Sequence, residues 1–312
     1  MMELRRAAAA VALSCSALVL TSCLARQRPI PRIKSASTQK LLTADKEALL
    51  QILSTESQLV NTLSATVDMV PSLGSANKGK ITEYKDFLAY VRYRKPLDIR
   101  IIGLYPVVRT TAFDMAADGK EFRLYLPSKD RFIEGRNEPV AKLSPNKLEN
   151  LRPSVFLDAL FIQPPASTQT TFPVDITDED SALYILHILD TGPDGQPRVV
   201  RDIWFDRLNL HIRRQMTFDD RGEILSDVRY NDWKTHNGVP FPKVIDINRP
   251  QDEYGVVMTM EKVEINKAIA DDQFVLKQPE GTTLQVLGGK ADETPQAAAP
   301  ADSSASRKKN DN

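Results

Sequence analysis

The sequence predicts a mainly β protein of the α+β kind, in which a strongly curved antiparallel sheet of about 10 to 11 strands forms an incomplete barrel with helices over its open side. Segments with apolar residues at every second position recur from Ala65 to Ile265, as half-buried strands require. Turn sequences such as Asp118-Gly119 separate these segments and favour antiparallel pairing. Apolar residues at helical spacing precede the strands and recur between their two halves.

The expected elements follow from these patterns. A first helix begins near Thr43, because Asp45 and Glu47 place acids in its first turn. Two short helical segments open at Ser144 and Ser154, and the second runs to Phe161. Strands are expected over residues 65–69, 89–93, 97–104, 107–115, 121–126, 182–189, 199–206, 211–218, 223–233, 244–248 and 255–265.

The N-terminus has the pattern of a lipoprotein signal peptide. Arg5 and Arg6 precede an apolar stretch of about fourteen residues, which is too short for a transmembrane helix. The run Leu20-Thr21-Ser22-Cys23 then resembles the lipobox of bacterial lipoprotein precursors. That resemblance implies removal of residues 1–22 and lipidation of Cys23. An ordinary secretory signal is the alternative.

The remaining chain divides into three expected parts. Residues 23–40 are rich in Arg, Pro and Ser and predict a flexible tether, residues 41–287 carry the folded domain, and residues 288–312 are expected to be a disordered tail. By the same resemblance to lipoproteins, Leu24 favours attachment to the outer membrane, facing the periplasm. The membrane would then be contacted through the lipid anchor.

Composition excludes several classes of function. The 41 basic and 41 acidic residues give a formal net charge of +0, so no global field would attract nucleic acid. Only three histidines are present, and none has the spacing of a metal site, so neither a metal nor a cofactor is expected. His187 is interpreted as a core histidine rather than a catalytic base. Asp178-Glu179-Asp180 is interpreted as a solvated turn, and we expect no enzymatic activity.

The C-terminal part of the domain resembles a known family. It contains Trp233-Lys234-Thr235-His236-Asn237-Gly238-Val239-Pro240-Phe241-Pro242, then Asn266, then Asp271-Asp272-Gln273-Phe274 and Pro279-Glu280-Gly281. This set, and the order of helix, strands, apolar helical segment and strands, is similar to the LolA/LolB superfamily of outer-membrane lipoprotein carriers. The resemblance covers about Thr43 to Gly281, and lipidation at Cys23 resembles LolB rather than soluble LolA.

The resemblance implies an apolar cavity that accepts acyl chains of lipids or acylated lipoproteins, and a periplasmic carrier protein as donor. The expected cavity residues are Val91, Ile99, Ile101, Phe113, Leu124 and Leu126. The expected lid residues are Phe156, Leu157, Leu160 and Phe161. The expected membrane-delivery loop is Pro106, Val107 and Val108.

Other interpretations fit the same residues. The cavity and lid side chains could fill an ordinary core, and Val107 could begin a buried strand. The protein could also be a non-enzymatic sensor or scaffold that binds lipids or lipoproteins and regulates an envelope partner. An anchored hydrolase would require a deeply placed carboxylate pair or serine.

Overall fold

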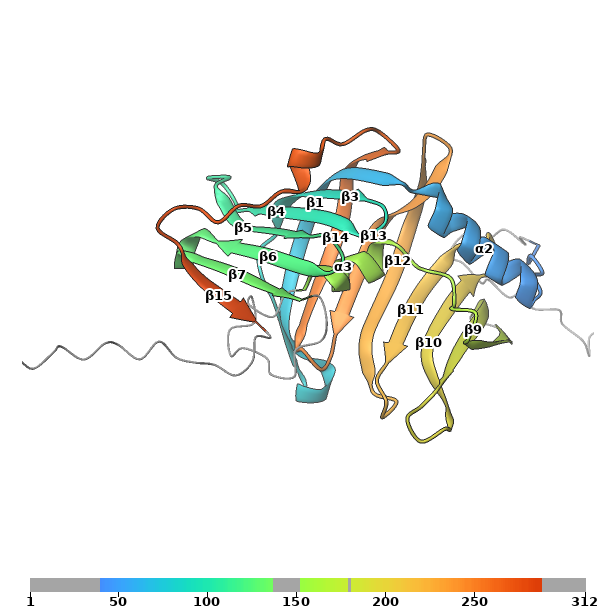
Figure 1. The fold of residues 1–312 in the computed structure, drawn as a ribbon. Coiled ribbons are helices and arrows are strands. Elements are labelled where there is room, and N and C mark those ends of the chain that lie inside the picture. Colours follow the sequence, from blue (N-terminus) through green and yellow to red (C-terminus); the bar gives the residue numbers. More distant parts are fainter. Residues whose placement is uncertain (1–39, 137–151, 179–180, 288–312) are drawn as a thin grey trace, which may run out of the picture.

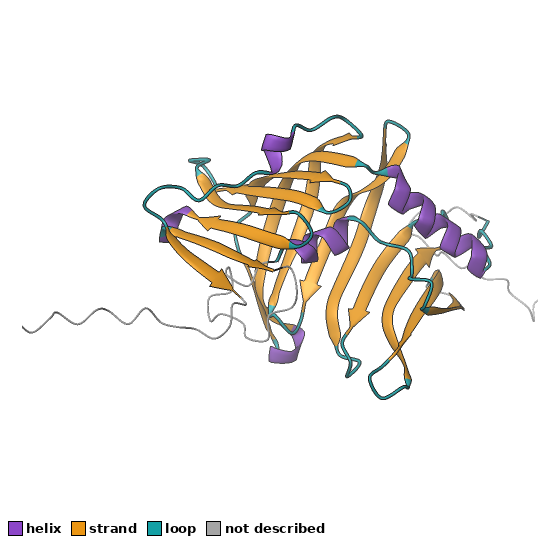
Figure 2. Ribbon diagram, viewed as in Figure 1, coloured by secondary structure: helices purple, strands orange, loops and turns teal. Residues whose placement is uncertain are grey.

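The computed structural model describes residues 40–136, 152–178 and 181–287, and this part of the chain is mainly β (Figures 1 and 2). It holds the α-helices α2 (Lys46–Leu59) and α3 (Pro153–Leu160) and one sheet of fifteen strands. The expectations for the signal peptide, Cys23, the tether, the helical segment at Ser144 and the C-terminal tail lie outside the described residues.

The strands are β1 (Thr62–Ser75), β2 (Lys80–Glu83), β3 (Phe87–Arg94), β4 (Asp98–Leu104), β5 (Thr111–Ala117), β6 (Glu121–Leu126), β7 (Arg131–Arg136), β8 (Thr170–Thr177), β9 (Ala182–Thr191), β10 (Pro197–Asp206), β11 (Ile212–Phe218), β12 (Ile224–His236), β13 (Val239–Arg249), β14 (Tyr254–Ile265) and β15 (Thr283–Leu287). Their order is β15-β7-β6-β5-β4-β3-β1-β14-β13-β12-β11-β10-β9-β8, and β2 pairs with β1. The sheet is open and does not close into a barrel.

Two features of the sheet correct the expectations. The count of about 10 to 11 strands is too low, because β2, β7, β8 and β15 were not expected. β8 contains Pro173, which lacks an N–H for the ladder, and it forms the edge of the sheet, where proline is tolerated. β15 pairs with β7 in parallel, so the sheet is not purely antiparallel. Such a pairing between distant segments leaves no turn signal in the sequence.

The contacts of α3 require the sheet to curve strongly. Arg152, which caps α3, places its guanidinium 4.9 Å from the ring centroid of Phe122 on β6. The Gln215 amide of β11 donates to the Asp158 carbonyl at 3.1 Å. In a flat sheet β6 and β11 would lie roughly 38 Å apart, whereas Arg152 and Asp158 are separated by only about 9 Å of helix. The sheet therefore wraps around α3 (Figure 1), and we call the face toward α3 the inner face.

Asn266, part of the family-like motif, joins the first helix to the sheet. Its Oδ1 accepts the Asn61 N–H at 2.8 Å, and its Nδ2 donates to the Leu59 carbonyl at the end of α2, also at 2.8 Å. Its φ of 59° lies in the left-handed region, which asparagine tolerates better than most residues. One side chain therefore fixes the end of α2, the start of β1 and the end of β14.

The helix α2 starts at a side-chain cap and buries one face. The Asp45 carboxylate accepts the Ala48 N–H at 2.8 Å, so the cap is Asp45 rather than the expected Thr43. Leu49 and Leu53, four residues apart, are fully buried in the main apolar cluster. Glu56 lies one turn further and is half-buried, and burial raises its pKa from 4.5 to about 7.

Glu56 should make the stability of the domain fall with pH. The native state keeps the proton up to about pH 7, whereas the unfolded chain releases it near pH 4.5, so ionisation between these values costs native stability. We predict that the free energy of unfolding decreases from pH 4.5 to 7 and that Glu56→Gln flattens this decrease. Denaturant titrations across this window measure it, with Glu47→Gln, an exposed position on the same helix, as control. An equal decrease in wild type and Glu56→Gln would refute the assignment.

Candidate functional site

The helix α3 is short, apolar and buried. Pro153 occupies its first turn, where a backbone N–H would have no acceptor within the helix, so proline costs no hydrogen bond there. The Phe161 N–H donates to the Leu157 carbonyl at 2.9 Å and closes the last turn. All four expected lid residues, Phe156, Leu157, Leu160 and Phe161, are at most 9% exposed. A helix of this length is not stable alone in water, so its packing against the sheet holds it in place.

The expected cavity residues come from four neighbouring strands and lie on the inner face. Their cross-strand register places Val91 beside Ile101, and Ile101 beside Met115, which pairs with Leu124. Gly103 lies under the Phe113 ring, which a Cβ atom at that position would overlap. Val91, Ile99, Ile101, Phe113, Leu124 and Leu126 are all at most 7% exposed.

The expected lid and cavity residues pack together in a single apolar cluster. The rings of Phe161 and Tyr93 of β3 stack with centroids 3.6 Å apart and an angle of 21°. α3 also contacts β5 and β13. In this structure the side chains of α3 therefore fill the space beside the expected cavity residues.

Two polar side chains of the sheet fasten the C-terminal end of α3. The Tyr230 hydroxyl of β12 donates to the Ala159 carbonyl at 2.8 Å, and the Gln215 amide donates to the Asp158 carbonyl. Both side chains are buried, at 2% and 3% exposure. They satisfy carbonyl groups that a helix end leaves without partners. We call this pair of hydrogen bonds the α3 latch.

Two charged groups lie near the α3 latch without a hydrogen bond or ion pair in the described part of the chain. Asp158 of α3 is open to solvent, yet the protein around it removes enough water to raise its pKa. Arg201 of β10 is half-buried. Loss of solvation lowers the pKa of its guanidinium, although the nearby negative charge of Asp158 acts to raise it. Sequence reasoning missed Arg201, Gln215 and Tyr230, because each is a lone polar residue in a strand.

The expected membrane-delivery loop is an exposed turn between β4 and β5. Val107 and Val108 are 88% and 69% exposed, so the alternative that Val107 begins a buried strand is wrong. The Val108 N–H donates to the Pro106 carbonyl at 2.9 Å, and Val107 has a φ of 72°. These features define a γ-turn of the rare strained class, an unusual conformation for a β-branched residue.

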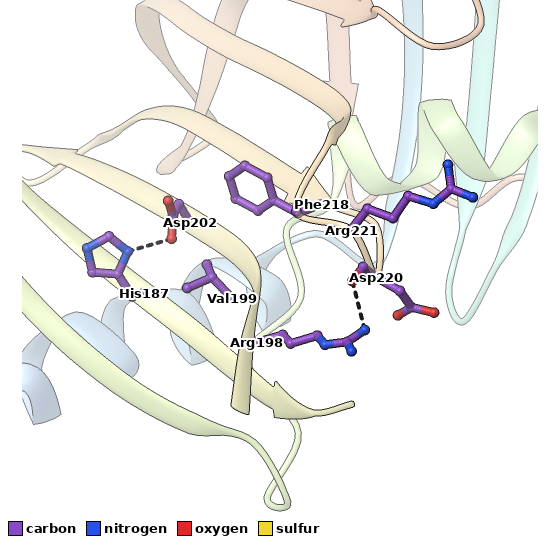
Figure 3. Close-up of a pocket in the computed structure, with 8 residues that line it drawn as sticks. His187, Arg198, Val199, Asp202, Phe218, Asp220 and Arg221 are labelled. Carbon is purple, nitrogen blue, oxygen red and sulfur yellow. Dashed lines mark hydrogen bonds and ion pairs between the residues drawn. The ribbon is translucent and has the colours of Figure 1, made fainter. Parts of the chain in front are cut away.

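His187 lies on the outer face rather than in the core. Its Nδ1 is 2.7 Å from Asp202 Oδ1, and both line a surface pocket of about 510 Å³ (Figure 3). The pocket also holds Arg198, whose guanidinium donates to Asp194 and to the Asp220 carbonyl. No serine, threonine or cysteine is among the residues that line it. The histidine has an orienting carboxylate but no nucleophile beside it, so the pocket gives no support to a hydrolase.

The other candidate groups are structural. Asp178 accepts the Ser181 N–H at 2.7 Å in a turn, while Glu179 and Asp180 lie outside the described residues. His211 stacks on Trp233 with ring centroids 4.7 Å apart. Among the residues with described positions, no group of three or more His, Cys, Asp or Glu side chains is placed to hold a metal ion. Within the same residues, neither helix is long and apolar enough to cross a bilayer.

Comparison with known proteins shows the fold. No protein-family model and no curated protein sequence matches the chain. Among solved structures, a LolA superfamily protein from Nitrosomonas europaea matches with a TM-score of 0.50 and 11% identity over 75% of this chain and 99% of that one. A DUF1329 family protein from Desulfovibrio piger matches with a TM-score of 0.51 and 14% identity over 75% and 98%. The resemblance to the LolA/LolB superfamily is thus confirmed at the level of the fold.

Proposed function

We propose that this chain is a membrane-anchored, non-enzymatic protein of the bacterial envelope that binds acyl chains of lipids or lipoproteins and helps deliver them to the outer membrane. The observation that carries the proposal is the position of α3, an apolar helix enclosed by a curved sheet. In the proposed cycle α3 acts as a lid over the open side. Acyl chains displace its side chains from the cavity residues and take their place.

The energies of the two occupants are comparable. Burial of the four large lid side chains is worth roughly 1.5–3 kcal/mol each, or roughly 6–12 kcal/mol together. An acyl chain with about 14 methylenes gains about 11 kcal/mol when it leaves water. One or two chains could therefore replace the lid side chains without a source of chemical energy. The α3 latch opposes this exchange by about 1 kcal/mol for each hydrogen bond.

The exchange predicts that a weaker latch favours lipid binding. Tyr230→Phe removes the hydroxyl that holds the Ala159 carbonyl, so it should raise the affinity for a triacylated peptide about fivefold. The measurement is fluorescence titration of the mature chain carrying Cys23→Ala, which keeps it free of its own acyl chains. The same peptide without acyl chains should not bind.

Tyr90→Phe is the matched control, because Tyr90 lies on the outer face of β3, 37% exposed. An unchanged affinity in Tyr230→Phe would contradict displacement of α3. Failure of the wild-type chain to bind the acylated peptide would contradict the proposed function itself. Saturable uptake without transfer to liposomes would favour a sensor or scaffold over a carrier.

The loop of Pro106, Val107 and Val108 is proposed to deliver the acyl chains. A strained backbone persists only where the surrounding structure holds it, and such residues cluster at functional sites. Here the strain presents two valines to solvent, next to the exposed Tyr105 and Arg109. Apolar side chains at a loop tip, flanked by a cation, suit insertion into the interface of a bilayer with anionic lipids.

Val107→Glu should reduce transfer of a bound acylated peptide to liposomes severalfold and leave its uptake nearly unchanged, because the charge opposes contact with the bilayer interior. Transfer is followed by fluorescence dequenching. Val286→Glu serves as the control, since Val286 is also exposed, at 60%, on β15. Equal transfer by wild type and Val107→Glu would remove the loop from the proposal.

The anchor is proposed to be the lipid on Cys23, in the outer membrane and facing the periplasm, with a periplasmic carrier protein as donor. Three acyl chains hold a protein far more firmly than a single chain does. Cys23→Ala should therefore shift the protein from the membrane fraction to the soluble periplasmic fraction, as judged by fractionation and immunoblotting. Retention of Cys23→Ala in the outer membrane would contradict anchoring through this residue.

A further inference from the structure

Beside the α3 latch, an apolar row of the inner face adjoins a more polar row. Across β9 to β12, cross-strand partners on one row are Leu186, Ile203, Gln215 and Val228. Three of these are apolar and at most 2% exposed. This row lies under α3, because Gln215 reaches the Asp158 carbonyl.

The neighbouring inner-face row is more polar. Arg201 is two residues from Ile203 on β10, so its side chain leaves the same face of the sheet. Its cross-strand partners are Ile188 and Thr217, and Thr217 pairs with Ser226. A guanidinium and two hydroxyl groups therefore border the apolar interior. The boundary resembles that between the tails and the head group of an amphiphile.

The hydrogen-bonding groups at this boundary are incomplete. Arg201 is half-buried and has no acceptor in the part of the chain with described positions. The Oε1 atom of Gln215 is buried and also has no donor. Groups of this kind are costly to withdraw from water unless a partner satisfies them. A ligand that suits these two groups carries an anion for Arg201 and a hydrogen-bond donor for the Oε1 atom of Gln215.

The geometry points to a phospholipid as the cargo, with its phosphodiester at Arg201 and a donor-bearing head group, such as ethanolamine, at the Oε1 atom of Gln215. The tails would then lie on the apolar row and extend toward the cavity residues. A triacylated peptide has neither phosphate nor ethanolamine, so this assignment distinguishes a lipid cargo from a lipoprotein cargo. The inference rests on the proposed function, because the tails need the space that α3 occupies.

The test uses three lipids with identical tails, one tail carrying a fluorophore: diacylglycerol, phosphatidylcholine and phosphatidylethanolamine. Each is titrated into the mature chain carrying Cys23→Ala. We expect phosphatidylcholine to bind about tenfold more tightly than diacylglycerol, and phosphatidylethanolamine to bind more tightly still, because each step adds a hydrogen bond to a charged group. Arg201→Gln should abolish the first difference, and Gln215→Leu should abolish the second.

Arg198→Gln is the matched control, since Arg198 lies on the same strand but is bound to Asp194 in the outer pocket. Thermal unfolding should show that Arg201→Gln is folded, because Arg201 has no hydrogen bond to lose within residues 40–136, 152–178 and 181–287. Equal binding of the three lipids by the wild-type chain would overturn this inference and leave acyl-chain binding intact. A preference for phosphate that survives Arg201→Gln would overturn it as well. Failure of all three lipids to bind would refute the proposed function.

Discussion

The packing of α3 against the inner face of the sheet is the interaction on which the rest of the structure depends. The helix is too short to exist alone, and the apolar inner face cannot remain open to water without a large cost. Each therefore needs an apolar partner. Because a single helix meets strands as far apart in the sheet as β6 and β11, the same packing also sets the curvature.

The contacts that fix the position of α3 contribute less free energy than its apolar burial, but they are more specific. Stacking of Phe161 on Tyr93 and the hydrogen bonds from Tyr230 and Gln215 fix where the helix ends. These contacts oppose replacement of the helix only weakly, because each hydrogen bond contributes about 1 kcal/mol. This weak opposition is what the proposed exchange of α3 for an acyl chain requires.

Much of the fold could be predicted from the sequence, because two-residue periodicity survives wherever one face of a strand is buried. This pattern did not predict β7, which is short, or β8, which contains Pro173. It also did not predict β15, whose parallel partner β7 is distant in the chain. The residues expected to line the cavity and to form the lid are all buried, as the strand and helix patterns indicate. Whether these side chains line a cavity or fill the core depends on where α3 lies. No local sequence pattern predicts the position of α3. Arg201 was missed for a related reason: only the sheet register places it beside Gln215 and α3.

The most direct measurement is hydrogen exchange of the α3 amides, residues 154–161, with and without saturating acylated ligand. We predict that the ligand speeds exchange in α3, because the helix loses its packing, while strands β3 to β6 remain protected. Exchange in α3 that stays unchanged or slows at saturation would show that the helix remains seated, and that result would contradict the claim that acyl chains take its place.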